Sequence, residues 1–388
     1  MSFDLIFKLI PNAIQNWVSG NPGTTTLSKV NSSTRFGILS YLTALMFMLP
    51  HVEATSAASL DQPKTEDVRG LPNISSNTSG NWDIFADALY WYASEQASAV
   101  WIDIIKIGDN TSSFGAQDIG FDWDFGFRLG TGYNFKRDQW DTKLYWTWFR
   151  TETHQSQKVF PEFIPVGGGV LVTEEMHPEF FAADISGDFA ARANIRWSLL
   201  FNMFDWELGR KYWVSKGLSL RPFIGIKGGW IHQSIYVHYK DLIVNSAPTE
   251  ISAKEHVKNN FWGVGPVGGV NTQWKLRDFG THFPSLFGDF SAATLWGTWS
   301  CDDVYNVTTG EKVDVKSRNS MLGALMLRGF LGVGWDVEFN RAKSHFAARL
   351  GFETQLWVNQ LRVATSQLVR LHGDLTLQGV TLNCDFDF

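Results

Sequence analysis

Several features are scarce in this sequence, and each scarcity excludes a class of protein. No uninterrupted apolar run reaches the roughly 18 residues that a transmembrane helix needs. Only two cysteines, Cys301 and Cys384, occur among 388 residues, which is too few for a disulfide framework. The net charge is -6, so the chain has no basic footprint for nucleic acid, and we expect no nucleic-acid partner.

Catalytic and metal-binding motifs are also scarce. His232 and His238 share one face of a predicted strand and His256 lies in the next predicted loop, but scattered surface histidines explain this spacing better than a metal site does. The glycines of GFRLGTGYNF at 126–135 precede no strand-to-helix transition, so they form no nucleotide-binding loop. We therefore expect no enzymatic activity, no cofactor and no bound metal.

Aromatic residues and glycine, by contrast, are abundant. The chain has 18 Trp, 30 Phe and 35 Gly, while its hydrophobic share is an ordinary 44%. In a membrane β-barrel the lipid-facing residues alternate with polar ones, so a hydropathy average conceals them. The composition is therefore typical of a β-barrel in a membrane.

The clearest alternation runs from Ile119 to Phe135. Apolar residues hold the odd positions with one exception, Thr131, and glycine or polar residues hold the even ones. Side chains of a strand point to opposite faces with a period of two, so one face is apolar and the other is charged or bare. A membrane-spanning strand needs roughly 9–11 residues, so this segment is long enough to cross a bilayer and project beyond it.

Further segments with the same period bring the predicted strands to ten. They lie at 83–94, 139–151, 193–210, 217–238, 259–274, 284–300, 319–339, 345–360 and 374–388. Short connections alternate with long ones, and the long ones fall near 95–118, 152–192, 239–258, 301–318 and 361–373. Outer-membrane barrels have short periplasmic turns and long external loops. The prediction is an all-β fold, an antiparallel transmembrane barrel of 10–16 strands, since 99–106 and 163–172 could supply additional strands.

Tryptophans near the predicted strand ends are candidates for the aromatic belts at the two membrane surfaces. Each of them could instead fill the lumen or pack against a loop. The candidates are Trp140, Trp148, Trp213, Trp274 and Trp299.

The N-terminal region is predicted to be an export signal. Phe36–Leu49 is an apolar run preceded by Arg35, and small residues follow it where a signal peptidase cleaves, near Ala54 or Ala58. The predicted organisation is a cleaved signal peptide with an unusual N-terminal extension (1–54), a flexible periplasmic lead-in (55–81) and the barrel (82–388).

Several stretches resemble one known family. They include DALYWYASE at 87–95, DWELGRKYWVSKGLSLRPFIGIKGGWI at 205–231 and LTLQGVTLNCDFDF at 375–388. The chain is similar here to the Legionella/Chlamydiales major-outer-membrane-protein-like porins, over about residues 83–388. The resemblance implies a pore-forming protein of a Gram-negative outer membrane. It departs from the cysteine-rich chlamydial proteins, because two cysteines do not support a disulfide-linked coat.

If the aromatic face meets lipid, the opposite face lines the lumen and carries the charges. In a wide barrel such charges line a wet channel and orient solutes, whereas in a narrow barrel they pair across the lumen and plug it. Acids and bases are nearly balanced on this face, so no preference for cations or anions follows. The predicted pore-lining residues are Asp122, Asp124, Arg128, Asp141, Lys143, Arg196, Arg221, Lys227, Arg328, Asp336, Glu338, Arg349 and Glu353.

The predicted function is a porin for passive diffusion of small hydrophilic solutes. The alternative is a closed barrel that acts as a structural surface protein or adhesin through its long loops, chiefly 152–192 and 239–258. Ten strands would favour the closed barrel, and 12–16 would favour a pore. Expected partners are outer-membrane lipid, the solutes, and the barrel-assembly machinery, which would recognise the C-terminal aromatics Phe386 and Phe388. Association into a homo-oligomer is left open.

Overall fold

The computed structural model describes residues 81–95, 100–107, 112–135, 139–166, 169–178, 189–244, 247–277, 279, 281–339, 344–364 and 370–388. The predicted signal peptide, and the predicted lead-in up to residue 80, lie outside these residues. The regular elements within the described ranges are all β-strands. None of those ranges contains a helix that is long and apolar enough to span a membrane.

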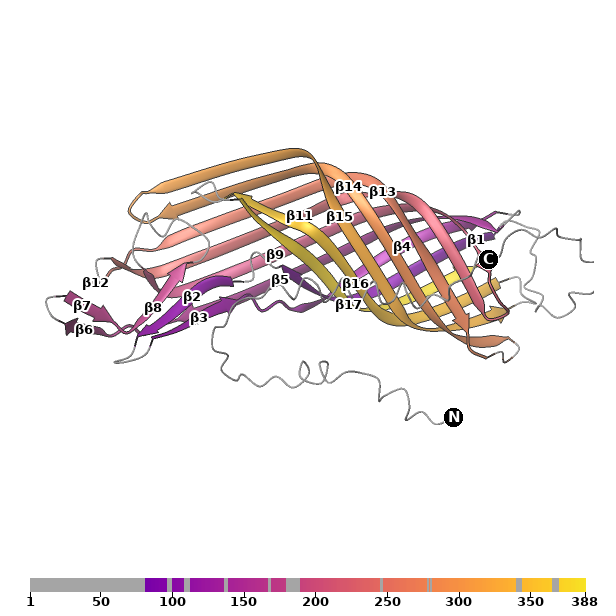
Figure 1. Ribbon diagram of the computed structural model, residues 1–388, viewed down its shortest axis with the longest axis horizontal. Helices are drawn as coiled ribbons and strands as arrows, with labels where there is room; N and C mark the ends of the chain where they lie inside the picture. The colour runs from indigo at the N-terminus through magenta and orange to yellow at the C-terminus, as the bar shows by residue number, and fades with distance from the viewer. Residues whose placement is uncertain are drawn as a thin grey trace, which may run out of the picture. The chain divides into compact units, whose positions relative to one another are not determined.

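Ten long antiparallel strands close into a barrel (Figure 1). The last strand pairs with the first, and β9 pairs with β11, so the sheet closes on itself. This confirms the predicted all-β barrel, at the lower end of the predicted range of strand number. The strands are β1 (Asn81–Glu95), β4 (Trp123–Asn134), β5 (Trp140–Lys158), β9 (Phe189–Arg210), β11 (Leu218–Val244), β13 (Ala253–Lys275), β14 (His282–Val307), β15 (Lys312–Phe339), β16 (Ser344–Ala364) and β17 (Arg370–Asp387).

The other strands of the described chain lie outside this ring. β2 (Val100–Ile107) pairs with β3 (Ser112–Asp118) and with β8 (Glu174–Pro178). β6 (Phe163–Val166) and β7 (Gly169–Val172) form a separate two-stranded sheet. The segments 99–106 and 163–172 thus contain strands, as predicted, but these strands are not part of the barrel wall. Two very short strands are β10 (Tyr212–Trp213) and β12 (Ala247–Pro248).

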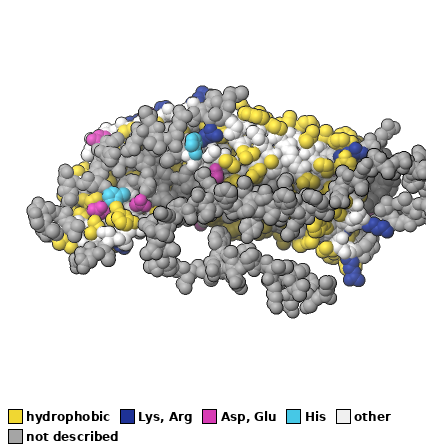
Figure 2. All heavy atoms as spheres, viewed as in Figure 1, with side chains coloured by type: hydrophobic (Ala, Val, Ile, Leu, Met, Phe, Trp, Pro, Cys, Tyr) yellow, Lys and Arg dark blue, Asp and Glu magenta, His cyan; other side chains and the backbone are white. Residues whose placement is uncertain are grey.

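The outward face of the barrel is apolar over a continuous band, and Figure 2 shows hydrophobic side chains gathered over this wall. Trp140 and Trp274 are exposed on it, as expected for belt residues. Trp299 is not a belt residue, because it is buried inside the barrel against Phe261, with ring centroids 4.3 Å apart. Other exposed members of the band include Ile84, Phe125, Leu144, Ile224, Trp262, Trp296, Leu331, Leu350 and Val380.

Beyond this band six strands continue as a sheet, which we call the outer extension. Figure 1 shows β11, β13, β14 and β15 running on past the ends of β16 and β17. Much of the predicted long loops 152–192, 239–258 and 301–318 is therefore strand, a correction to the loop assignment. Charged and polar side chains mark these parts as lying outside the bilayer, because they replace the apolar residues on the outward face. The outer extension comprises residues 150–158, 189–198, 232–244, 253–260, 298–307 and 312–320.

The segment that alternates so clearly in sequence is not a strand over its whole length. β4 begins at Trp123, four residues after the alternation starts. Ile119 is buried, and Phe121 packs edge-to-face on Trp197 of β9 with ring centroids 4.8 Å apart. The first residues of the segment therefore pack into the interior instead of extending the lipid-facing wall.

Candidate functional site

The lumen has a polar half near the chain termini and an apolar half toward the outer extension. The polar half contains a cavity of about 380 Å³. The periplasmic turns hold one end of it, through residues such as Asn134 and Lys211, and Arg128 and Arg328 line it more deeply. Its wall carries acids and bases from neighbouring strands, so it is a charged pocket on the periplasmic side.

A buried ion cluster, which we call the central ion cluster, closes the deep end of the cavity. It consists of Asp87, Arg128, Arg328 and Glu353. Arg128 donates hydrogen bonds to Asp87 Oδ2 at 2.6 Å and to Glu353 Oε1 at 2.8 Å. Arg328 Nε donates to the same Glu353 oxygen at 2.7 Å. Glu353 has no exposed surface, and the two guanidinium groups balance its charge, with further hydrogen bonds from Gln355 and Thr381.

Two more groups of paired charges connect the strands on the opposite side of the lumen. Arg221 Nε donates to both oxygens of Asp141 at 2.9 Å, and its Nη1 donates to Glu207 Oε2 at 2.9 Å. Lys227 Nζ donates to Asp205 at 2.6 Å. These side chains are buried or nearly so, and breaking such a pair by removing one partner costs about 3–5 kcal/mol.

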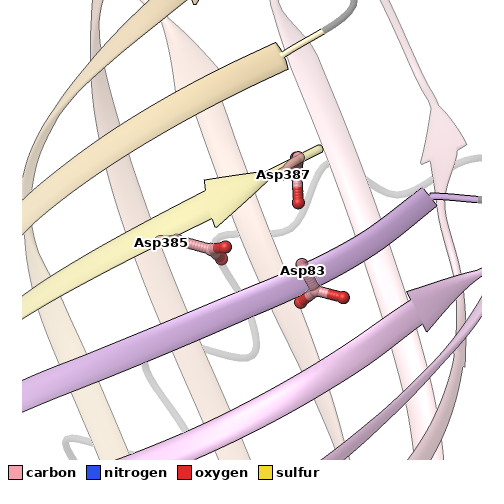
Figure 3. A group of neighbouring side chains, drawn as sticks. All are labelled: Asp83, Asp385 and Asp387. Atoms are coloured by element: carbon pink, nitrogen blue, oxygen red, sulfur yellow. The ribbon is translucent and has the colours of Figure 1, made fainter.

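Three carboxylates meet at the seam between β1 and β17, near the periplasmic end (Figure 3). One oxygen each from Asp83, Asp385 and Asp387 lies within 4.8 Å of the others, a spacing that a divalent cation could use. Lys143 Nζ already lies 3.5 Å from Asp83 and 3.6 Å from Asp385. His345 Nδ1 lies 3.3 Å from Asp387. Each of the three carboxylates thus has a cationic or titratable side chain of the chain itself beside it.

Above the central ion cluster the lumen is filled by large apolar side chains, which we call the aromatic plug. Trp91 and Phe149 pack with ring centroids 5.6 Å apart, and Phe201 and Trp357 pack at 5.7 Å. All of them have an exposed fraction of 1% or less, as in the core of a globular protein. The aromatic plug consists of Trp91, Phe149, Phe201, Phe261, Trp299 and Trp357.

The plug is attached directly to the ion cluster below it. Trp91 Nε1 donates to Thr381 Oγ1 at 3.0 Å, and Thr381 Oγ1 donates to Glu353. The Arg128 guanidinium also lies 5.9 Å from the centre of the Trp91 ring. Polar and apolar layers are thus continuous, and together they occupy the middle of the barrel.

Most of the predicted pore-lining residues do lie on the inward face. Asp124 is half-buried on β4, opposite Trp91 of β1. Lys227 and Glu353 are buried in ion pairs. Whether any of these residues lines an open pore stays a prediction. The members that line the cavity are Arg128, Asp141, Lys143, Arg221, Arg328, Asp336, Glu338 and Arg349.

Two predicted pore-lining residues do not face the lumen. Arg196 points outward from the outer extension and pairs with Glu152 at 2.5 Å. Its strand was assigned the wrong way round, because the inward face of β9 is the apolar one: Trp197 and Phe201 are buried inside the barrel. Asp122 is exposed and precedes β4, since the strand begins one residue later.

The same error concealed functional residues of the ion network. Asp205 and Glu207 share a face of β9 with the buried apolar residues, so alternation placed them toward lipid. Tyr145, whose hydroxyl donates to Glu207 at 2.7 Å, was missed because aromatic residues were taken to face lipid. The carboxylates themselves were the available signal, because an unpaired acid on a lipid-facing wall is costly.

A pair of acids is buried on the inward side of the outer extension. Glu255 of β13 and Asp303 of β14 have exposed fractions of 1% and 2%. Burial, and then the neighbouring Asp303 charge, raises the pKa of Glu255 well above its ordinary value. Burial raises the pKa of Asp303 to about 6. Burial thus favours the protonated form of both acids, outside the bilayer.

Comparisons with solved structures give outer-membrane proteins at low similarity. A major outer membrane protein from Thermus thermophilus is 10% identical, with 80% of this chain and 100% of that chain covered and a TM-score of 0.30. The outer membrane protease OMPT from Escherichia coli is 8% identical, with 79% and 96% covered and a TM-score of 0.34. The P. putida toluene transporter TodX is 9% identical, with 79% and 89% covered and a TM-score of 0.26. Likenesses at this level do not bear on what this chain does.

No curated protein matches the sequence significantly. A family model does match it, over residues 74–388, which include all ten strands of the barrel. That model describes the Legionella pneumophila major outer membrane protein precursor. The barrel and its apolar outer band agree with a place in the outer membrane. The chain belongs to the Legionella pneumophila major outer membrane protein family.

Proposed function

We propose that this outer-membrane protein is a closed barrel that serves as a structural surface protein and displays the outer extension outside the cell. The observation that carries the proposal is the filled lumen. A ten-stranded barrel has room for packed side chains but little for an aqueous channel. Here the aromatic plug and the central ion cluster lie one above the other across that space.

The chemistry of the two layers supports closure in different ways. The plug excludes water because its members pack ring against ring, for example Phe261 on Trp299 at 4.3 Å. The ion cluster holds strands far apart in sequence together, since Glu353 binds arginines of β4 and β15. An ion that crossed the barrel would have to break buried pairs and displace an apolar core.

The outer extension supports the surface role. It is a sheet of six long strands rather than a set of mobile loops, so it presents a fixed surface to the outside. The acids and bases of the lumen are bonded to one another, for example Arg221 to Asp141, which leaves them poorly placed for catalysis. We therefore propose a non-enzymatic role.

Conductance in planar bilayers tests this proposal. The wild-type protein is expected to insert without opening ion-sized steps. The double variant Trp91→Ala/Trp357→Ala removes two fully buried indoles, and current steps from it would show that insertion had occurred and that the plug closes the barrel. Regular ion-sized steps from the wild type would overturn the closed barrel.

A diffusion porin is the second candidate, and one observation favours it. The cavity of about 380 Å³ is lined by charged residues and reaches the periplasmic turns, as one half of a solute path would. A porin of this kind would need the aromatic plug to move aside. Regular ion-sized steps from the wild type, with a larger conductance in the Trp357→Ala variant, would establish it.

We also propose that the C-terminal aromatics act as the assembly signal. Phe386 is exposed on the outward face of β17, and its ring stacks with that of Phe388 at 6.0 Å. The variant Phe388→Ala is expected to reach the periplasm normally but to assemble more slowly, as measured by the heat-modifiable gel shift of folded barrels. Leu350→Ala, on the same lipid-facing wall, serves as the control.

A further inference from the structure

An apolar groove of about 650 Å³ crosses the outward wall where β5, β9, β11 and β13 lie side by side. Its walls are large exposed side chains, among them Trp206 and Trp230 at 45% and 40% exposure. Trp262, at 57% exposure, stands opposite Trp230 in the β11–β13 register. The groove therefore lies within the lipid-facing band and runs up to its outer margin.

Glycine makes the floor of the groove. Gly228 lies on the outward face of β11 between Phe204 of β9 and Val264 of β13. A Cβ atom at this position would come within 3.2 Å of the Val264 side chain and of the Gly263 carbonyl oxygen. The backbone is thus open to the membrane here, while the neighbouring side chains rise on each side. This shape accommodates a flexible hydrocarbon chain.

Directly above the groove, the outward faces of β11 and β13 become basic. Outward positions from 232 to 240 and from 254 to 260 carry three lysines and three histidines but no acid. We call this patch the basic collar. Its members are His232, His238, Lys240, Lys254, His256 and Lys258.

The lysines of the basic collar are not used in ion pairs. Lys254 and Lys258 are exposed, and neither has an ion-pair partner within the described ranges. Asp302 of β14 is the register neighbour of Lys258, and Lys316 on its other side pairs with Asp314 at 3.2 Å. The register neighbours of Lys254 are His238 and Asn306, so no acid lies directly beside this lysine. Burial, and then Lys258, lowers the pKa of His256, and burial followed by Lys240 and Lys254 lowers that of His238. Burial is the larger cause of both shifts, and the nearby lysines add to it.

The basic collar follows the groove directly along β13. Lys258 lies four residues beyond Trp262 on β13, about 13 Å along the strand. A lipid requires an apolar surface for its acyl chains and cations near its headgroup. The tryptophans at the edge of the apolar band and the lysines beyond them provide both. Lysine stems also reach down toward such a headgroup.

We propose that the groove and the basic collar form one binding site for a phosphate-bearing glycolipid of the outer leaflet. Its acyl chains would lie along Gly228 between the tryptophans. Its phosphates would meet Lys254 and Lys258, with the His232–Asn260 hydrogen bond of 2.7 Å holding the polar margin of the site. This site concerns the outward wall, so it does not depend on whether the lumen is open or closed.

Native mass spectrometry of the delipidated, folded barrel tests the site with diphosphoryl lipid A as the probe. The wild type is expected to retain one lipid at low concentration. The double variant Lys254→Gln/Lys258→Gln should weaken retention about tenfold. Trp230→Ala/Trp262→Ala should weaken it by a similar factor without altering the gel shift of the folded protein.

The matched control is Lys158→Gln/Lys216→Gln, which removes the same charge from two exposed lysines outside the basic collar. It should leave retention within about twofold of the wild type. Equal losses from both lysine pairs would mean non-specific attraction, and would overturn the site. Equal retention of dephosphorylated lipid A would overturn the role of phosphate, and equal retention of phosphatidylglycerol would overturn the choice of an outer-leaflet glycolipid.

Discussion

Below Trp91 the lumen is lined with paired charges, whereas above it the same barrel is packed with indole and phenyl rings. The packing of the charged half depends on each partner being present, whereas that of the apolar half depends on shape and volume. Removing one member of a buried ion pair leaves an uncompensated charge, while removing a ring leaves a cavity that neighbours partly fill. The two halves should therefore respond differently to substitution.

The largest loss of stability is expected from Glu353→Ala. It leaves Arg128 and Arg328 buried without their shared carboxylate, so the free energy of unfolding should fall by about 3–5 kcal/mol. Urea-induced unfolding in lipid vesicles, followed by tryptophan fluorescence, measures this. The control Glu152→Ala removes an acid from the outer surface and should cost at most about 1 kcal/mol. Equal losses would contradict the central role of the buried cluster.

A loss of about 3 kcal/mol is expected from Trp357→Ala in the plug, because the ring is fully buried and its neighbours relax only in part. The same unfolding experiment measures it. Trp335→Ala removes an equally large ring from the lipid-facing wall and should cost less, since acyl chains replace the lost contacts. A larger effect at Trp335 would mean that the apolar half is not packed as a core.

Moderate effects are expected from pH in the outer extension. The folded pKa of Asp303 is raised to about 6, above its ordinary 3.8, so the folded state binds more protons between these values. Stability of the extension should therefore fall as pH rises from about 4 to 6, and the raised pKa of Glu255 adds a fall of the same sign. Asp303→Asn should make the slope shallower and stabilise the extension at pH 7.5 by about 1 kcal/mol. Hydrogen exchange at several pH values measures both, and a slope of opposite sign would contradict the burial of the pair.

The smallest effect is expected from Arg196→Cys. Its pair with Glu152 is partly exposed, so the stability change should be about 0.5 kcal/mol or less. A membrane-impermeant thiol reagent added to intact cells should label this cysteine rapidly. Thr381→Cys, which is fully buried in the lumen, should stay unlabelled. If the thiol reagent did not label the cysteine at position 196, the inward orientation predicted from alternation would be correct.

Much of the architecture could be predicted because alternation reports the strands directly. The ten strands predicted from the sequence correspond to the ten strands of the barrel wall, from β1 to β17. Alternation also places many charged residues of the polar half on the inner face, for example Arg128 and Glu353, but it places Asp205 and Glu207 of β9 on the wrong one. Alternation shows that a strand has two faces, but not which of them faces inward.

That ambiguity explains the errors. In the outer part of β9 the lumen is apolar, so Trp197 faces inward and Arg196 outward, the reverse of the assignment. The prediction of long loops is wrong for a related reason. Beyond the membrane both faces of a strand carry mixed residues, so a segment such as 239–258 lacks the alternation that identifies a strand. The ion pairs across the lumen could not be predicted at all, because they depend on which strands the closed barrel places opposite one another.

The unequal length of the strands leaves a long edge in the outer extension. Within the described chain, pairing of β15 with β16 stops at Leu325, so residues 312–322 pair only with β14. A bare strand edge is a template on which another chain can add a strand and begin to aggregate. Lys312, Asp314, Lys316 and Arg318 occupy this edge. An incoming strand would have to strip water from these charges, so crowded copies in one membrane are kept from joining edge to edge.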